Sequence, residues 1–336
     1  MILVTGATGL IGSHLLAELV GQGHPCRAIK RQDSDLETVR KVFKRKFKSD
    51  KEFETVEWLE ADLLDIEALR RAVSGSQYVF HCAAMVSFFS NDSEIMKKTN
   101  IQGTRYLVNL ALEEKVQKFI FVSSSAAIGN QPDSEVVSES GKWIKDAGNS
   151  NYGLSKYLAE LEVWRASEEG LDMAIINPCI VIGPGNWGSS SPVLFTRINK
   201  GLKFYTPGSN AFVDVRDVVS IMLKLCFGEI KNERYLLCSE NLSYKSLFDM
   251  IAPSLDQAAP DFEVKRWMAN LAMIFENIKS FFAGRKPFIT RETVQNGFRD
   301  IRYSNEKAKK ELNFEFIPIR ESVQFTADAF LEDRKH

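Results

Sequence analysis

The chain has 336 residues, 44% of them hydrophobic, and a formal net charge of −1 at pH 7. This length can form one large domain and a smaller lobe, and the balanced charge gives no general reason to bind nucleic acid or acidic membranes. We expect no signal peptide before the first predicted strand, and no apolar run is long enough to span a bilayer. The five scattered cysteines lack metal-ligand spacing. We therefore expect a cytoplasmic protein with reduced thiols and no metal site.

A short apolar strand at the start of the chain leads into three glycines and then into a helical pattern. In such a phosphate-binding turn, Gly6 permits the tight bend, Gly9 lets backbone N–H groups approach a pyrophosphate, and Gly12 lets the helix pack on the strand. The start of the helix supplies further unpaired N–H groups. We predict a dinucleotide site here, which also includes Thr8, Leu10 and Ile11.

Apolar runs and helical stretches alternate through the first half of the chain. We predict strands at 2–5, 26–29, 54–59, 78–82, 118–123 and 173–177, and helices near 10–22, 65–73, 94–114 and 152–169. This alternation predicts a Rossmann-like, doubly wound parallel sheet of the α/β class. We assign residues 1–182 to this dinucleotide-binding domain and expect 211–239 to rejoin it with a strand at 235–238.

The remaining residues, 183–210 and 240–336, are expected to form a smaller, mostly helical substrate-binding lobe. Within it, residues 266–283 are rich in large apolar side chains. We interpret this segment as an amphipathic core helix, and the alternative is a lid over an apolar substrate or a membrane-surface contact. The basic stretch at 40–51 is interpreted as a solvated helix face, because no nucleic-acid recognition motif accompanies it.

The residues at the end of the second predicted strand indicate whether the cofactor is NAD or NADP. An NAD site usually has a carboxylate there to bind the ribose 2′-hydroxyl. This chain has Lys30 and Arg31 instead, which match a 2′-phosphate, so NADP is favoured over NAD. Asp62 and Leu63, after the third strand, are placed for the adenine ring, although Asp62 could equally cap a turn.

Tyr152 and Lys156 lie four residues apart and therefore on one face of a predicted helix. A neighbouring ammonium would lower the pKa of the phenol, which would make Tyr152 a general acid and base near neutral pH. Ser125 follows the strand at 118–123, at the sheet edge where open α/β sheets bind ligands. We expect Ser125 to hold the reacting oxygen against Tyr152.

These segments resemble the extended short-chain dehydrogenases/reductases, often called the NAD-dependent epimerase/dehydratase family. The resemblance covers nearly the whole chain and rests on the glycine turn, Ala83-Ala84, Asn100, Ser125, Tyr152 with Lys156, and the segment from Asn177-Pro178 to Gly185. It implies that Tyr152 transfers the proton, that Lys156 also binds the nicotinamide ribose, and that Asn100 supports the helix and a proton relay. Cofactor contacts are also implied at Ala83, Ala84, Pro178, Ile180 and Val181.

Within this family, the chain resembles the dihydroflavonol reductase and 3β-hydroxysteroid dehydrogenase branch. Ala126 and Ala127 replace the acidic pair of the dehydratases, and Asn210 stands where epimerases carry a phosphate-gripping Arg, a role that Arg216 or Arg197 could take. We therefore expect an NADP-dependent oxidoreductase that reduces a ketone or aldehyde of an apolar small molecule. The alternatives are a nucleotide-sugar epimerase that uses NAD and a non-catalytic dinucleotide sensor.

Two further expectations accompany this reading. An apolar substrate pocket would be formed by side chains that follow the fourth strand and by aromatic groups of the second lobe: Met85, Val86, Phe88, Trp187, Phe195 and Tyr205. The resemblance also implies a homodimer formed through the helices near 94–114 and 152–169.

Overall fold

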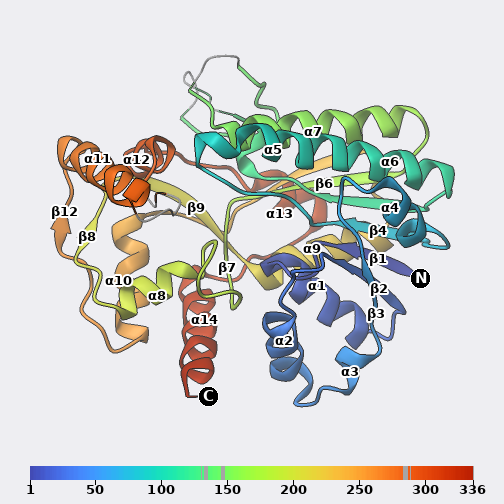
Figure 1. Ribbon diagram of the computed structural model, residues 1–336, viewed down its shortest axis with the longest axis horizontal. Coiled ribbons are helices and arrows are strands. Elements are labelled where there is room, and N and C mark those ends of the chain that lie inside the picture. The colour runs from blue at the N-terminus through green and yellow to red at the C-terminus, as the bar shows by residue number, and fades with distance from the viewer. Residues whose placement is uncertain (130, 132–134, 145–147, 283–286, 288, 336) are drawn as a thin grey trace.

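The computed structural model describes residues 1–129, 131, 135–144, 148–282, 287 and 289–335. Its main feature is a seven-stranded sheet in the order β10-β6-β5-β4-β1-β2-β3, with every neighbouring pair parallel (Figure 1). The strands are β1 (Ile2–Thr5), β2 (Cys26–Lys30), β3 (Glu57–Glu60), β4 (Tyr78–His81), β5 (Lys118–Val122), β6 (Met173–Pro178) and β10 (Glu233–Leu237). The predicted Rossmann-like doubly wound sheet is confirmed, including the late strand β10, which joins its edge.

Helices cover both faces of the sheet, because successive side chains of a strand point to opposite sides and both sets are apolar here. One face packs against α1 (Leu10–Gly21), α2 (Glu37–Phe47) and α9 (Val215–Phe227). The other packs against α4 (Ile66–Val73), α6 (Gly103–Glu113) and α7 (Asn151–Glu168). The predicted helices at 10–22, 65–73 and 152–169 correspond to α1, α4 and α7.

One predicted strand starts later than expected. Glu54 is the last residue of α3 (Lys51–Glu54), and β3 begins only at Glu57. The ring of Phe53 is buried and packs edge-on against Phe43 of α2, with 5.6 Å between ring centroids. This aromatic contact stabilises a helical turn where the apolar sequence predicted a strand, so the prediction for residues 54–56 was wrong.

The predicted helix at 94–114 consists of three consecutive pieces. After a 3₁₀ turn at Ser90–Asp92, α5 (Ser93–Lys97) continues into a π-helical turn at Lys98–Gln102 and then into α6. Asn100 lies in the π-helical turn. Such turns occur often at functional sites, because the extra residue re-aims the side chains of the helix.

The C-terminal part of the chain is mostly helical, as predicted, and also contains two small sheets (Figure 1). β9 (Ser209–Asp214) pairs with β7 (Ile180–Ile182) and β11 (Glu240–Ser243), while β8 (Phe204–Tyr205) pairs with β12 (Phe262–Glu263). The helices are α8 (Val193–Asn199), α10 (Tyr244–Ser254), α11 (Arg266–Phe282), α12 (Arg291–Gly297), α13 (Glu306–Leu312) and α14 (Ile319–Arg334). In the described part of the chain, no helix has the length and hydropathy that a membrane span needs.

The structure corrects the interpretation of residues 266–283 as a core helix and that of the basic stretch 40–51 as a solvated helix face. α11 is not a core helix, because its Trp267 and Phe275 side chains are 61% and 70% exposed, so that interpretation was wrong. The basic helix α2 is solvated only in part: Arg45 donates a 3.2 Å hydrogen bond to the Ala329 carbonyl and pairs with Asp333. These contacts tie α2 to α14, which lies far away in the sequence.

Candidate active site

The glycine turn has the geometry that a phosphate cradle requires. Gly6 has φ +68°, and a Cβ there would lie 2.5 Å from the backbone nitrogen of Ala83. A Cβ at Gly12 would lie 2.2 Å from the Gly6 carbonyl oxygen. Gly9 caps α1 without a side-chain hydrogen bond, and the first turn of α1 has no acidic residue. The residues present therefore fit a dinucleotide, whose phosphates would meet the N–H groups at the start of α1.

The segment that follows β7 lies over the start of α1. The His14 Nε2 atom hydrogen-bonds the Pro184 carbonyl at 2.8 Å, and a Cβ at Gly185 would lie 3.1 Å from Leu10 Cδ1. The structure thus brings the glycine turn together with the segment predicted to lie beside the nicotinamide. Pro178, at the end of β6, and Ile180 and Val181, in β7, precede these contacts along the chain.

A pocket of about 390 Å³ lies where the adenosine end of the cofactor is predicted. Arg31 and Asp62 both line it, and Lys30 ends the adjoining strand β2. Arg31 is exposed and pairs with Asp33 at 3.4 Å, while Asp62 Oδ1 accepts a 2.8 Å hydrogen bond from the Leu64 backbone N–H. Asp62 therefore does cap a turn. The other lining residues are Gln32, Asp33, Glu60, Ala61 and Asp65, so one cation faces four carboxylates.

The first turns of α7 carry Tyr152 and Lys156. Lys156 is 1% exposed, and its ammonium donates a 2.8 Å hydrogen bond to the Val122 carbonyl at the end of β5. The same ammonium lies 4.2 Å from the centre of the Phe121 ring. These contacts fix the cation between the sheet and the helix that bears the predicted acid.

The electrostatics differ from the sequence expectation in one respect. Burial raises the pKa of Tyr152, and a hydrogen bond with Ser124 lowers it by less. The predicted net lowering of the Tyr152 pKa was wrong, because burial has the largest effect on this pKa and raises it. Burial also lowers the pKa of Lys156 to about 8, against the opposing effect of the Glu160 carboxylate.

The two candidate serines have different partners. Ser124 caps the 3₁₀ turn Ser125–Ala127 and shares a hydrogen bond with the Tyr152 hydroxyl. Ser125 hydrogen-bonds the Cys179 thiol and the phenol of Tyr303. Both hydroxyls lie at the carboxyl end of β5, as predicted, and Ser125 remains the predicted substrate contact on the family pattern.

Asn100 ties three elements together. Its side chain is 2% exposed, and its Oδ1 accepts a 2.7 Å hydrogen bond from the Met85 N–H. Its Nδ2 donates to the Met85 carbonyl at 3.0 Å and to Ser155 Oγ at 2.9 Å. The residue thus fixes both the segment after β4 and helix α7 next to Tyr152.

The predicted substrate residues fall into two groups. Phe88 lies edge-to-face with Tyr152 at 6.3 Å, and Val86 and Phe88 are 54% and 37% exposed. Phe195 is 1% exposed within the core of the second lobe, which leaves it no surface for a substrate. Trp187 and Tyr205 pack against the same core, and Trp187 donates a 2.8 Å hydrogen bond to Asp333. The first group, with Met85 beside it, is the one that borders Tyr152.

Sequence reasoning missed several residues that surround this site. His81 is buried between the hydroxyls of Thr5 at 2.7 Å and Thr104 at 3.0 Å, and burial lowers its pKa to about 3. Glu160, 1% exposed, accepts a 2.6 Å hydrogen bond from Asn177. A polar residue ending an apolar strand was a signal for His81, whereas nothing in the sequence connected Tyr303 with Ser125.

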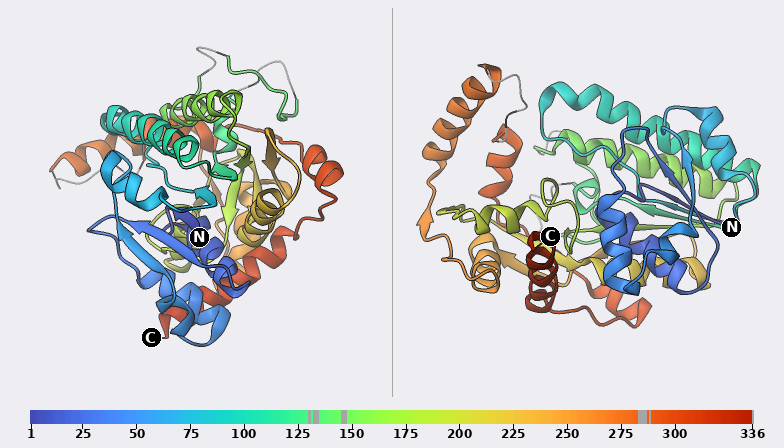
Figure 2. Two further views of the ribbon diagram at one scale, coloured as in Figure 1. Left: turned by 90° about the vertical axis from the view of Figure 1, so that its right-hand side faces the viewer. Right: turned by 60° about the horizontal axis from the view of Figure 1, so that its bottom comes forward.

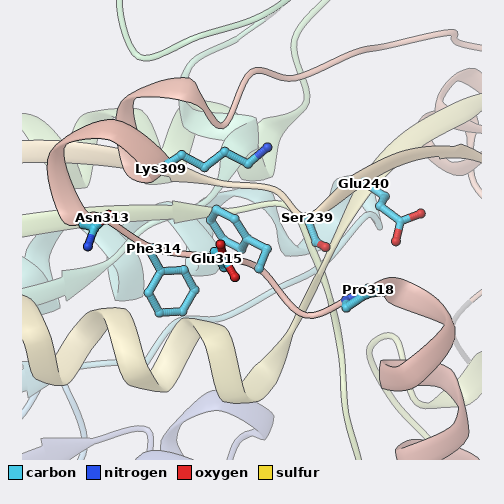
Figure 3. Close-up of a pocket in the computed structure, with 8 residues that line it drawn as sticks. Ser239, Glu240, Lys309, Asn313, Phe314, Glu315 and Pro318 are labelled. Carbon is cyan, nitrogen blue, oxygen red and sulfur yellow. The ribbon is translucent and has the colours of Figure 1, made fainter.

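A second pocket, of about 580 Å³, lies away from these residues (Figure 3). It is formed by the start of β11 and the segment that joins α13 to α14, and its lining residues are Ser239, Glu240, Lys309, Asn313, Phe314, Glu315, Phe316 and Pro318. None of the predicted site residues lines it. This pocket is larger than the one beside Arg31, but it is not the site of the chemistry expected at Tyr152.

Comparisons with known proteins identify the family of this chain. The model of the "NAD dependent epimerase/dehydratase family" matches residues 2–237. The "Putative dihydroflavonol 4-reductase" of Synechocystis is 28% identical over 97% of this chain and 92% of that protein. Cinnamoyl-CoA reductase 1 of Petunia hybrida is 28% identical over 100% and 93% of the two chains.

The UDP-glucose 4-epimerase of Thermotoga maritima, solved with UDP-glucose, superposes with a TM-score of 0.77. It is 21% identical, and the match covers 99% of each chain, so it supports the fold alone. The family match, the reductase relatives and the glycine turn agree with one another. The chain therefore belongs to the NAD dependent epimerase/dehydratase family and is an NAD(P)-dependent oxidoreductase of the extended short-chain dehydrogenase/reductase type.

Proposed function

We propose that the protein is an NADP-dependent reductase that converts a ketone or aldehyde of an apolar small molecule into an alcohol, with Tyr152 as general acid. The observation that carries this proposal is the placement of Tyr152. Its hydroxyl bonds Ser124, its ring borders the exposed Phe88, and the buried Lys156 ammonium follows one helical turn later. The similarity to reductases supports the direction of the reaction.

The nicotinamide supplies the hydride when the cofactor is bound. As the carbonyl oxygen becomes an alkoxide, Tyr152 gives it the phenolic proton. The Tyr152 phenol, whose pKa burial raises, is protonated at neutral pH, as an acid that works in the direction of reduction has to be. A serine hydroxyl donates a hydrogen bond to the same oxygen, and the family pattern favours Ser125. Lys156 stabilises the phenolate that remains.

Two positions and one apolar surface support an apolar substrate over a nucleotide sugar. Asn210, in place of the phosphate-gripping Arg, hydrogen-bonds the Tyr244 phenol. Arg216, a possible substitute for that Arg, is bound through two nitrogens to Asp214 at 3.0 and 2.7 Å. A diphosphate needs cations that replace its lost hydration, and an apolar ring needs only surface to bury. Met85, Val86 and Phe88 offer such surface beside Tyr152.

NADP is proposed because Lys30 and Arg31 end β2, where an NAD site would place a carboxylate. The four carboxylates of the adjoining pocket favour NAD instead, since they would repel a 2′-phosphate. NADP binding requires the Arg31 guanidinium to leave its ion pair with Asp33 and to bind the 2′-phosphate instead. A guanidinium can bind a phosphate through two parallel hydrogen bonds.

We also propose a domain arrangement, an oligomeric state and a cellular location for the enzyme. Residues 183–210 and 240–336 would bind substrate beside the domain of 1–182 and 211–239. A homodimer would form through α5, α6 and α7, where Ile95 and Leu161 are 47% and 45% exposed. The spacing of the cysteines along the sequence supports a reducing, cytoplasmic location.

Thermal-shift screening in the presence of NADPH tests the substrate class. The panel sets steroid, flavonoid and aryl ketones against UDP-, GDP- and dTDP-sugars. We expect stabilisation and NADPH oxidation with an apolar ketone, at an affinity that changes little with ionic strength. Stabilisation by a sugar nucleotide alone, followed by an epimerised product, would establish the epimerase alternative. Cofactor binding without turnover of any panel member would favour a sensor.

A further inference from the structure

Helix α11 turns its most apolar side chains outward. Trp267, Leu271, Ile274, Phe275 and Ile278 are 61%, 46%, 50%, 70% and 51% exposed. At roughly 100° per residue they fall within an arc of about 100° around the helix axis. We call these five side chains the apolar stripe. A surface helix usually directs such a stripe at the core, so this orientation calls for an external partner.

The opposite side of α11 is the packed one, and it is less apolar. Ala269 and Ser280 are buried, Met273 and Glu276 are half-buried, and all four lie on the far side of the helix from the apolar stripe. Ser280 Oγ donates a 3.3 Å hydrogen bond to Glu276. α11 packs against α12, and Figure 2 shows α11 at the outer margin of the molecule with α12 on its inner side. The packing of α11 against α12 therefore keeps the apolar stripe on the outer side of the helix.

Cations flank the apolar stripe at both ends. Arg266 and Lys279 are exposed, and they are the only exposed charged residues among positions 266–280 of α11. Lys265 adds a third exposed cation directly before the helix. The exposed acids Asp261 and Glu263 precede the helix and are not part of it. The helix surface thus combines aromatic and aliphatic side chains with basic ends.

A second copy of this chain fits the apolar stripe poorly. A two-fold contact through one helix face would place Arg266 against Arg266, or Arg266 against Lys279, depending on the helix direction. Like charges brought together at an interface weaken it. A partner with negative charge around an apolar layer matches the same surface, and a bilayer with anionic headgroups has that arrangement.

We propose that α11 docks the protein on an anionic lipid membrane, lying in the plane of the interface with the apolar stripe among the upper acyl chains. Lys279 then meets the headgroups, while the Arg266 guanidinium lies 5.7 Å from the centre of the Phe298 ring at the start of the helix. Phe204 and Phe262, 52% and 47% exposed and paired edge to face at 5.4 Å, add apolar surface near the start of the helix. This inference does not rest on the proposed reaction, because the catalytic residues lie outside α11.

Co-flotation of the full chain with lipid vesicles tests the proposal. The probes are vesicles of phosphatidylglycerol and phosphatidylcholine in equal parts, and vesicles of phosphatidylcholine alone. We expect the protein to float with the anionic vesicles and to bind the neutral ones several-fold more weakly. The double variant Phe275→Ser/Ile278→Ser should lose about tenfold or more of the binding. Lys279→Glu should weaken it several-fold, and high salt should reduce the wild type in the same direction.

Ile66→Ser is the matched control, because Ile66 is 39% exposed on α4 in the other part of the molecule. It should float like the wild type. All substituted side chains are exposed, so unchanged melting temperatures are expected, and Lys279→Glu provides an independent readout if the double variant unfolds.

Four results would overturn the proposal. The wild type could fail to float with anionic vesicles, or the double variant could float as well as the wild type. Sedimentation could show that the wild type is a dimer and that the double variant is a monomer. This result would identify a second copy of the chain as the partner of the apolar stripe. The double variant could also raise the KM for a ketone while vesicle binding is unchanged, which would identify α11 as a substrate lid.

Discussion

The side-chain amide of Asn100 donates a 2.9 Å hydrogen bond to Ser155 Oγ, and this bond joins the π-helical turn to the helix that carries Tyr152. Asn100 also holds both backbone groups of Met85. One buried amide therefore positions the proposed acid and one side of the substrate surface together.

Asn100→Ala should lower both stability and turnover. Removing the amide leaves buried partners unsatisfied, which costs about 1–3 kcal/mol of the free energy of unfolding. Urea unfolding and steady-state kinetics measure the two effects. Asn109→Ala is the control, because Asn109 lies in the same helical stretch and its amide oxygen accepts from the surface Arg165. Equal behaviour of the two variants would remove Asn100 from its positioning role.

Tyr152→Phe should retain cofactor binding and lose turnover by a factor on the order of 10²–10⁴, the usual contribution of a positioned acid. Calorimetry with NADPH and single-turnover kinetics measure the two properties. Tyr157→Phe, on the same helix with its ring stacked on Trp143, should keep nearly full activity. Near-full activity of Tyr152→Phe would rule out the proposed proton donor.

The two serines can be separated by substitution. Ser125→Ala should lower kcat by a factor on the order of 10², since it removes a donor to the developing oxyanion. Ser124→Ala should have the smaller effect and mainly move the alkaline limb of the pH profile to higher pH, because the Ser124 hydrogen bond lowers the pKa of the Tyr152 phenol. If Ser124→Ala loses more kcat than Ser125→Ala, the roles are reversed.

Arg31→Ala should remove most of the preference for NADPH over NADH. A bidentate, charge-assisted contact with the 2′-phosphate contributes on the order of 1.5–3 kcal/mol. Calorimetric titration of both cofactors into the wild type and the variant measures this contribution. Asp33→Asn is the paired variant: it frees the Arg31 guanidinium from its 3.4 Å partner, so NADPH affinity should rise. A wild type that prefers NADH would overturn the NADP assignment.

Acid should destabilise the protein through His81. Burial lowers the pKa of this ring to about 3 from its ordinary 6.5, so the unfolded chain binds more protons than the folded one between these values. The stabilisation is fully present above pH 6.5 and is lost as the pH falls towards 3. Between pH 7.5 and 5 the loss amounts to about 2 kcal/mol. Urea unfolding at several pH values should show a flatter profile for His81→Gln than for the wild type.

Much of the fold followed from local patterns. The apolar runs gave the strands of the large sheet, because strands covered by helices on both faces need apolar side chains throughout. The exception at residues 54–56 shows the limit of such patterns. Phe53 sits in a helical turn because Phe43, ten residues earlier, offers it an aromatic contact, and only the folded chain brings the two rings together.

The sequence by itself also determined the site residues whose roles depend on local geometry. Gly6 and Gly12 are needed wherever a strand turns closely into a helix, and Tyr152 and Lys156 share a helix face through their spacing alone. Tertiary structure decided what lies around them. Burial raises the pKa of Tyr152, the Val122 carbonyl engages the Lys156 ammonium, and Tyr303 reaches Ser125 from far along the chain. Desolvation and long-range hydrogen bonds depend on which segments meet in space, and spacing along the chain does not encode them.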